Sequence, residues 1–236
     1  MGFFRRGASS GPESDDLAEA NDDLVLTTRE RGPWDVEEVA DRGRRLDLGS
    51  LWLPGRDGME LRMEIEKTSK IVSAAAISLN GSALQLQVFA APRTEGVWDD
   101  IRAEIAQSVE KQGGSVDDVP GPFGRELLAR LPVRTTEGRT GHRPARFVGH
   151  DGPRWFLRGV VTGRAAVEPA DATELEDIFA DVVVVRGSEP RAPRDLLPLT
   201  MPGQRSAVVP PTPSVPGPDS PGFDPLTRGP EITEIH

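Results

Sequence analysis

Alternation of apolar and polar residues predicts several β-strands in the first half of the chain. The clearest segment has apolar side chains at every second position, with charged residues between them: Met59, Leu61, Met63 and Ile65. This pattern is typical of a strand with one face in the core and one face in solvent. Residues 71–79 form an apolar run, residues 84–90 alternate again, and residues 46–52 alternate loosely. Asn80-Gly81 is the strongest short signal for a hairpin turn.

Apolar residues spaced three and four apart predict two amphipathic helices. The first has one apolar face and is expected to end at Gly113-Gly114; its apolar residues are Trp98, Ile101, Ile105 and Val109. The second covers about residues 173–182, with Asp171 or Thr173 as the expected N-cap. Its apolar face holds Leu175, Ile178, Phe179 and Val182.

Further strands are expected between and after these helices. Residues 126–133 and 143–150 fit strands, Asp151-Gly152 fits a second hairpin turn, and residues 154–162 fit the return strand. Residues 182–185 either continue the second helix or form a short terminal strand.

Together these elements predict an α+β fold. We expect an antiparallel sheet of about six to seven strands with two main helices packed on one side, in the order βββα followed by βββα. The two halves repeat the same order of turn, strand, loop and helix, but their residues match poorly. A duplicated architecture and a chance likeness therefore both stay open.

Composition divides the chain into one domain and two tails. Residues 1–23 hold six acidic residues and two arginines and are expected to be a disordered acidic tail. Residues 30–190 are expected to form a single domain, and residues 191–200 a transition segment. Residues 201–236 hold nine of the 22 prolines and are expected to be a disordered, proline-rich tail.

Charge and composition limit the classes of partner and chemistry. The net charge of -10 disfavours binding to nucleic acid, because phosphate contacts need a positive surface. The absence of cysteine excludes disulfides and thiolate chemistry. Neither a long apolar run nor a signal-peptide pattern is present, so we expect a cytoplasmic protein without membrane partners. The chain has 25 arginines and three lysines. This imbalance reflects either coding bias or selection for bidentate contacts to anions.

No catalytic or metal-binding pattern stands out. The histidines do not have the spacing of metal ligands, and Ser9 matches the nucleophile motif G-x-S-x-G only within the acidic tail. No glycine-rich phosphate loop follows a strand, and residues 55–58 fit a simple turn. Adjacent carboxylates such as Asp117-Asp118 diverge on a helix and are explained as loop or helix-start charges. We therefore expect no catalytic residue, no metal and no cofactor.

Arginines on the predicted strand 154–162 are the best candidates for binding. Arg154, Phe156 and Arg158 share one face of this strand, whereas Trp155 and its alternate neighbours share the face expected in the core. Arg143 and Arg146 lie on the strand paired with it. Such a face either grips anions and stacks bases, or is a solvent-exposed face whose arginines pair with acidic residues on another strand. For the second alternative the expected partners are Glu60, Glu64 and Glu66.

Three segments of the chain carry a resemblance to a known family: GPWD at 32–35, RLDLGSLWLP at 45–54 and DGPRWFLRG at 151–159. They resemble the DUF3710 family, an actinobacterial family of unknown function. The likeness covers about residues 30–200. It implies a cytoplasmic actinobacterial protein and assigns no catalytic residue.

We therefore hypothesise a non-enzymatic binding or adaptor domain. It would recognise a protein partner through a sheet face or edge, with the tails acting as tethers. The alternative is a protein that associates with nucleic acid or nucleotides through the face formed by Arg154, Phe156 and Arg158.

Overall fold

The computed structural model describes residues 31–93, 96–134 and 140–203, and it is of the α+β class. Seven strands form the larger sheet: β4 (Glu60–Ile65), β5 (Val72–Leu79), β6 (Ser82–Ala90), β7 (Ser115–Gly121), β8 (Gly124–Arg134), β9 (Thr140–Gly152) and β10 (Trp155–Thr162). Four short strands form a second sheet: β1 (Trp34–Asp35), β2 (Leu46–Asp47), β3 (Leu51–Leu53) and β11 (Val183–Val184). The helices are α1 (Trp98–Lys111), α2 (Pro169–Asp181) and the short 3-10 turns η1 (Val36–Glu38) and η2 (Arg164–Ala166).

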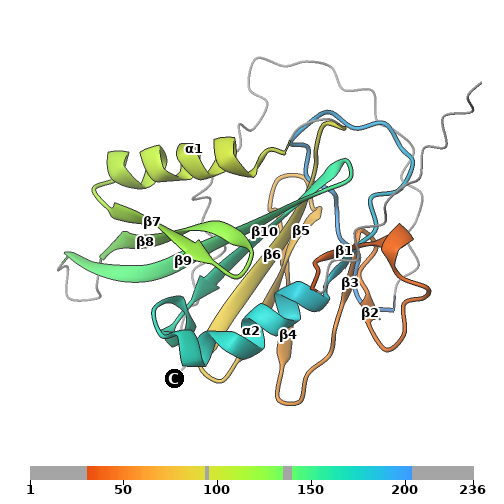
Figure 1. The fold of residues 1–236 in the computed structure, drawn as a ribbon, viewed down its shortest axis with the longest axis horizontal. Helices are drawn as coiled ribbons and strands as arrows, with labels where there is room; N and C mark the ends of the chain where they lie inside the picture. Colours follow the sequence, from red (N-terminus) through yellow and green to blue (C-terminus); the bar gives the residue numbers. More distant parts are fainter. Residues whose placement is uncertain (1–30, 94–95, 135–139, 204–236) are drawn as a thin grey trace, which may run out of the picture. The chain divides into compact units, whose positions relative to one another are not determined.

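The larger sheet is antiparallel throughout and has the strand order β4-β5-β6-β10-β9-β8-β7 (Figure 1). The predicted hairpin at Asn80-Gly81 is confirmed, since both residues have positive φ and join β5 to β6. Strand β10 then inserts between β6 and β9, so the two halves of the chain form one continuous sheet. This agrees with the predicted antiparallel sheet of six to seven strands.

The smaller sheet was not predicted. It has the order β1-β11-β3-β2 and is mixed, because β1 runs parallel to β11 while the other pairs are antiparallel. Residues 182–185 thus contribute a short strand, one of the two alternatives left open by their sequence. The buried indole Nε1 of Trp155 donates to Oδ2 of Asp35 over 2.6 Å and ties β1 to the larger sheet. Strands of two or three residues carry too few alternating positions for a pattern to reveal their pairing.

The two helices pack on opposite faces of the larger sheet, which corrects the expectation that both lie on one side. Helix α1 shares a core cluster with Phe89, Phe147 and Phe156. Helix α2 shares a different cluster with Trp155 and Leu157. Successive residues of β10 therefore enter different cores, because side chains alternate across a strand. The two clusters give the sheet an apolar core on each face.

The turn between β9 and β10 also differs from the prediction. Asp151 and Gly152 belong to β9 and pair with Phe156 and Trp155, so the turn residues are Pro153 and Arg154. Proline fixes φ at the first turn position, and Arg154 takes a left-handed φ of 64° at the second. At position 152 only glycine fits, because a Cβ there would overlap the indole of Trp155.

Two further differences concern the ends of elements. Strand β7 was not predicted, and its residues Asp117 and Asp118 were explained as loop or helix-start charges. It lies at the edge of the sheet, where proline and charge are tolerated. Helix α2 begins at Pro169 with Glu168 as N-cap, earlier than the predicted caps, since proline is well suited to the first helical turn.

The segment after β11 pairs with the end of β6 and the start of β5. Backbone hydrogen bonds join Ala90 to residues 194 and 195, and the amide of Leu197 donates to the carbonyl of Val88 over 2.8 Å. The amide of Leu199 then donates to the carbonyl of Val72 over 3.0 Å. Leu197 and Leu199 are buried, so this segment covers part of the core. The predicted tails, residues 1–23 and most of 201–236, lie outside the described residues. No described helix is long and apolar enough to span a membrane.

Candidate anion-binding surfaces

Phe156 is an interior residue. Its side chain is 0% exposed, and its ring stacks with Trp98 of α1 and with Phe89, at centroid distances of 5.7 and 6.1 Å. Helix α1 covers this part of the sheet because its apolar face fits the aromatic residues below it. The ring is therefore in no position to stack on a base at the protein surface.

Arg158 is also part of the interior, although it shares its face with Phe156 as predicted. It is 6% exposed, its guanidinium donates to the side chain of Gln87, and it lies 5.5 Å from the ring centre of Phe89. Burial of its aliphatic stem and a cation–π contact account for this placement. The expected outer face of β10 is thus a packed layer of the domain.

Arg146 forms a buried ion cluster on the opposite face. It donates to Glu126 of β8 over 3.3 Å and to Glu176 of α2 over 2.7 Å. Glu126 is 1% exposed, and this burial raises the pKa of its carboxyl although Arg146 acts in the other direction. The alternative in which the arginines of the sheet pair with acidic residues of the same domain is therefore correct for Arg146. Its partners are acids that sequence reasoning did not name.

Arg154 and Arg143 remain at the surface in different surroundings. Arg143 is exposed on β9. Arg154 lies in the β9–β10 turn, and its carbonyl accepts a hydrogen bond from Nε of Arg186 over 3.2 Å. The pKa of Arg186 is lowered by burial and by the positive charges of Arg154 and Arg191. The structure thus brings one predicted residue, Arg154, together with two arginines that sequence reasoning missed.

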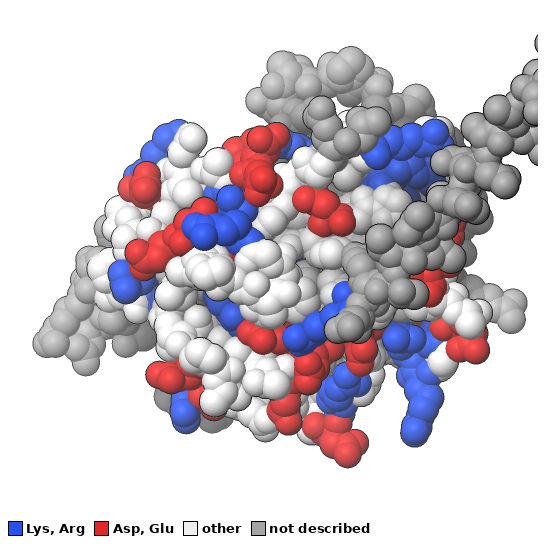
Figure 2. Space-filling model, viewed as in Figure 1, with Lys and Arg blue, Asp and Glu red and all other residues white. Residues whose placement is uncertain are grey.

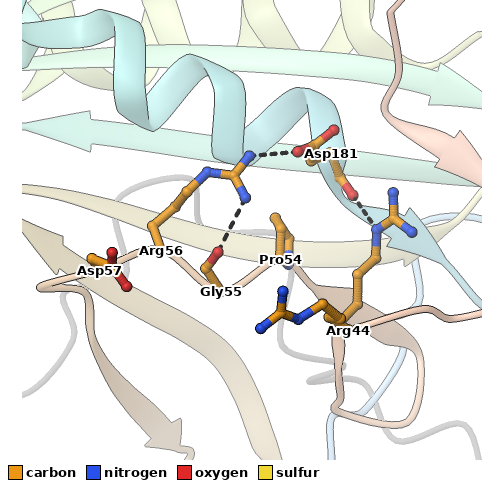
Figure 3. A pocket seen from close by; sticks show the side chains of 7 residues that line it. Arg44, Pro54, Gly55, Arg56, Asp57 and Asp181 are labelled. Atoms are coloured by element: carbon orange, nitrogen blue, oxygen red, sulfur yellow. Dashed lines mark hydrogen bonds and ion pairs between the residues drawn. The ribbon is translucent and has the colours of Figure 1, made fainter.

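A second basic site is a hollow of about 800 Å³ between the smaller sheet and the end of α2 (Figure 3). We call it the arginine hollow. Three arginines, two aspartates and a turn line it: Arg44, Arg45, Pro54, Gly55, Arg56, Asp57 and Asp181. They come from the chain before β2, the turn after β3 and the last residue of α2.

Asp181 holds two of the three arginines in the hollow. Its carboxylate accepts from Arg56 over 2.5 Å, and its backbone carbonyl accepts from Nε of Arg45 over 2.9 Å. Arg56 also donates to the carbonyl of Gly55 over 3.1 Å. Arg44 is exposed and has no ion pair with any of the residues described. In Figure 3 these side chains line one concave surface.

Local sequence explains why the arginines converge. Arg45 precedes β2 and Arg56 follows β3. Because β2 and β3 are antiparallel, the chain returns after β3 to the end of the pair where β2 starts, which brings Arg56 near Arg45. Gly58 has a φ of 73° in the turn that follows, which favours glycine. Sequence reasoning treated residues 55–58 as a turn without function. The sequence feature that could have revealed this site is the pair Arg44-Arg45 directly before β2, together with Arg56 shortly after β3.

Comparison with known families assigns the chain to one of them. Residues 32–207 match the model of DUF3710, described as a protein of unknown function. The chain belongs to the DUF3710 family. This match confirms the resemblance seen in the sequence. It covers most of the described residues of this DUF3710 protein, including the arginine hollow and the segment after β11.

The side chains that line the arginine hollow include groups able to bind anions. The residues lining the arginine hollow supply guanidinium and carboxylate groups but no hydroxyl, imidazole or amine that would act as a nucleophile. Within the described part of the chain, no group of three acidic or histidine side chains is placed to hold a metal ion. Guanidinium groups bind carboxylate and phosphate with paired hydrogen bonds.

Proposed function

We propose that this DUF3710 protein is a non-catalytic binding module that takes an anionic side chain of a protein partner into the arginine hollow. The observation that carries this proposal is the convergence of three guanidinium groups on one concave surface, with Asp181 orienting two of them. Orientation before binding reduces the entropy lost on association.

Charge in the hollow favours an acidic ligand. Three arginines and two aspartates leave one excess positive charge, and Arg44 has no carboxylate partner among the described residues. Arg45 uses Nε in its hydrogen bond to Asp181, so its two terminal nitrogens stay available to a ligand. A carboxylate of an aspartate or glutamate side chain matches this arrangement.

A protein partner is supported by the neighbouring sheet edge. Strand β2 is the edge of the smaller sheet, and Leu46 next to Arg45 is 37% exposed. An extended segment of a partner can lie along such an edge and direct an acidic side chain into the hollow. Of the two modes of recognition expected from the sequence, a sheet face or a sheet edge, this proposal uses the edge. Recognition through a face of the larger sheet is less favoured, because a core cluster packs on each face.

The proposal is tested by affinity capture from cells that naturally produce the protein. We expect Arg44→Glu to lose a partner that the unaltered chain retains, because the substitution reverses the charge of an exposed guanidinium that has no ion pair with the described residues. The matched control is Arg62→Glu on β4, whose side chain is 64% exposed and lies outside the hollow. A partner retained by Arg44→Glu at the level of the control would contradict the proposal.

The non-catalytic part of the proposal has a separate test. Purified protein is incubated with a panel of generic esters, phosphoesters and glycosides. We expect no turnover above buffer. Hydrolysis by the unaltered protein that is lost when a residue of the described domain is substituted would contradict this proposal and indicate an enzyme.

A further inference from the structure

Arg186, in the segment after β11, is fixed by backbone carbonyl groups. Its Nε donates to the carbonyl of Arg154 over 3.2 Å, and its terminal nitrogen NH1 donates to the carbonyls of Gly187 and Glu189 over 3.4 and 2.8 Å. Carbonyl groups orient a guanidinium without cancelling its charge, whereas a carboxylate would neutralise it. The second terminal nitrogen, NH2, is left for a ligand.

Two more arginines add positive charge beside Arg186. Arg154 contacts Arg186 through its carbonyl, and Arg191 pairs with Glu189, whose carbonyl also accepts from Arg186. Burial and the charges of these two arginines lower the pKa of Arg186. Glu189 pairs with Arg191 at 3.5 Å. Arg194 of the same segment instead pairs with Glu104 and is not part of this group. We call Arg154, Arg186 and Arg191 the arginine cluster.

The cluster has an excess of two positive charges when Glu189 is counted against its three arginines. Figure 2 shows basic side chains gathered over the segment that follows β11. The excess matches the charge of a phosphate monoester near neutral pH better than that of a single carboxylate. Three acceptor oxygens of a phosphate also suit several neighbouring guanidinium groups.

We propose that the arginine cluster is a binding site for a phosphate monoester dianion, separate from the arginine hollow. The two sites share no residue: the hollow is built around β2, β3 and the end of α2, and the cluster from the β9–β10 turn and the segment after β11. The cluster site therefore stands or falls independently of the function proposed for the hollow.

The direct test is titration of the full chain with a short neutral peptide that carries one phosphoserine, followed by calorimetry. We expect saturable binding by the unaltered protein and at least a tenfold loss of affinity in Arg154→Asn. Asparagine is chosen because it tolerates the left-handed φ of this position. The Arg154 side chain makes no hydrogen bond or ion pair with the described residues, so the substitution should leave the fold intact.

Arg186→Gln is a second variant and should lose affinity to a similar degree. Arg143→Gln is the matched control, because Arg143 is an exposed arginine on the neighbouring strand and lies outside the cluster. Its affinity should stay within twofold of the unaltered protein. Absence of saturable binding, or an equal loss in Arg143→Gln, would overturn the proposal, since only general charge attraction would then be at work.

A further arm identifies the source of the phosphate. The same titration is repeated with glycerol phosphate, which carries the monoester without a peptide. Tighter binding of the peptide assigns the site to a phosphorylated side chain, and equal binding assigns it to a free phosphate ester. Either result supports the site, whereas tight binding of the unphosphorylated peptide would contradict it.

Discussion

Two acidic residues hold one arginine of the sheet, Arg146, in the interior. Glu126 and Glu176 hold Arg146 between β8 and α2, so this guanidinium serves the packing of the helix on the sheet. Arg154 has no comparable partner and stays available at its turn. Arginine thus has a structural role on β9, at Arg146, and a candidate binding role in the β9–β10 turn, at Arg154.

The raised pKa of Glu126 predicts a specific pH dependence of stability. The folded state holds this proton more tightly than the unfolded chain does. The contribution of Glu126 is therefore fully present below the ordinary carboxyl pKa and is lost as pH rises through the raised value. We expect the free energy of unfolding of the unaltered protein, relative to Glu126→Gln, to fall as pH increases through this window.

Urea unfolding of both proteins at several pH values, from about 4 to neutral, measures this difference. Glu60→Gln is the control, since Glu60 is largely exposed on β4. A difference between the unaltered protein and Glu126→Gln that does not change with pH would contradict the role given to burial.

Removing the positive partner should be costly. Arg146→Ala leaves Glu126 buried beside Glu176 without a counter-charge, and we expect a loss of about 3–5 kcal/mol in the free energy of unfolding. Arg130→Ala on β8 is a suitable control, because Arg130 is exposed and its pair with Asp117 is long at 3.7 Å. Chemical denaturation checks this. Equal losses in the two variants would show that the buried cluster has no special weight.

At the scale of elements, Asp151 connects β9 to α1. Its carboxylate accepts from the backbone amides of Val97 and Trp98 over 2.8 and 3.2 Å, at the start of a helix that has no side-chain cap of its own. Negative charge at this end is also favoured by the helix dipole. The residue predicted to be a turn residue therefore caps a helix from 54 positions away in the chain.

Asp151→Ala should destabilise the protein by about 1–2 kcal/mol, the usual cost of losing a helix cap. Thermal unfolding followed by circular dichroism measures the change. Asp57→Ala is the control, because Asp57 is exposed in a turn and is absent from the described hydrogen bonds and ion pairs. An Asp151→Ala variant as stable as this control would show that the cap has no energetic role.

Close packing of α1 on β9 gives another prediction. A Cβ at Gly149 would overlap the indole of Trp98, whereas a Cβ at Gly55 would meet no atom within 4 Å. Gly149→Ala should therefore lower the free energy of unfolding by about 1–3 kcal/mol through overpacking. Gly55→Ala should change the free energy of unfolding by no more than about 0.5 kcal/mol. Denaturant titration of both variants distinguishes close packing from a general effect of removing glycine.

Sequence patterns predicted correctly the elements that depend on residues close together in the chain. The hairpin at Asn80-Gly81 and the apolar face of α1 were found because each depends on neighbouring residues. Strand β7 and the start of α2 were missed, since an edge position and a first-turn proline override the usual signals. The true β9–β10 turn was displaced because Asp151 and Gly152 serve long-range contacts.

At the scale of the whole molecule, sequence patterns indicated the class but not the layers. Alternation shows that a strand has two different faces, but it does not show which helix covers which face. Phe156 was therefore assigned to an open surface although α1 packs on it. The arginine hollow was also missed, because Arg44, Arg56 and Asp181 meet only after β2, β3 and α2 have packed together.

The central claim is that the arginine hollow binds an acidic group of a protein partner. The most direct measurement is the Kd of a purified, captured partner for the Arg44→Glu variant and for the Arg62→Glu control. We expect Arg44→Glu to weaken binding at least tenfold, about 1.4 kcal/mol, relative to Arg62→Glu. Equal values of Kd for the two variants would contradict the account.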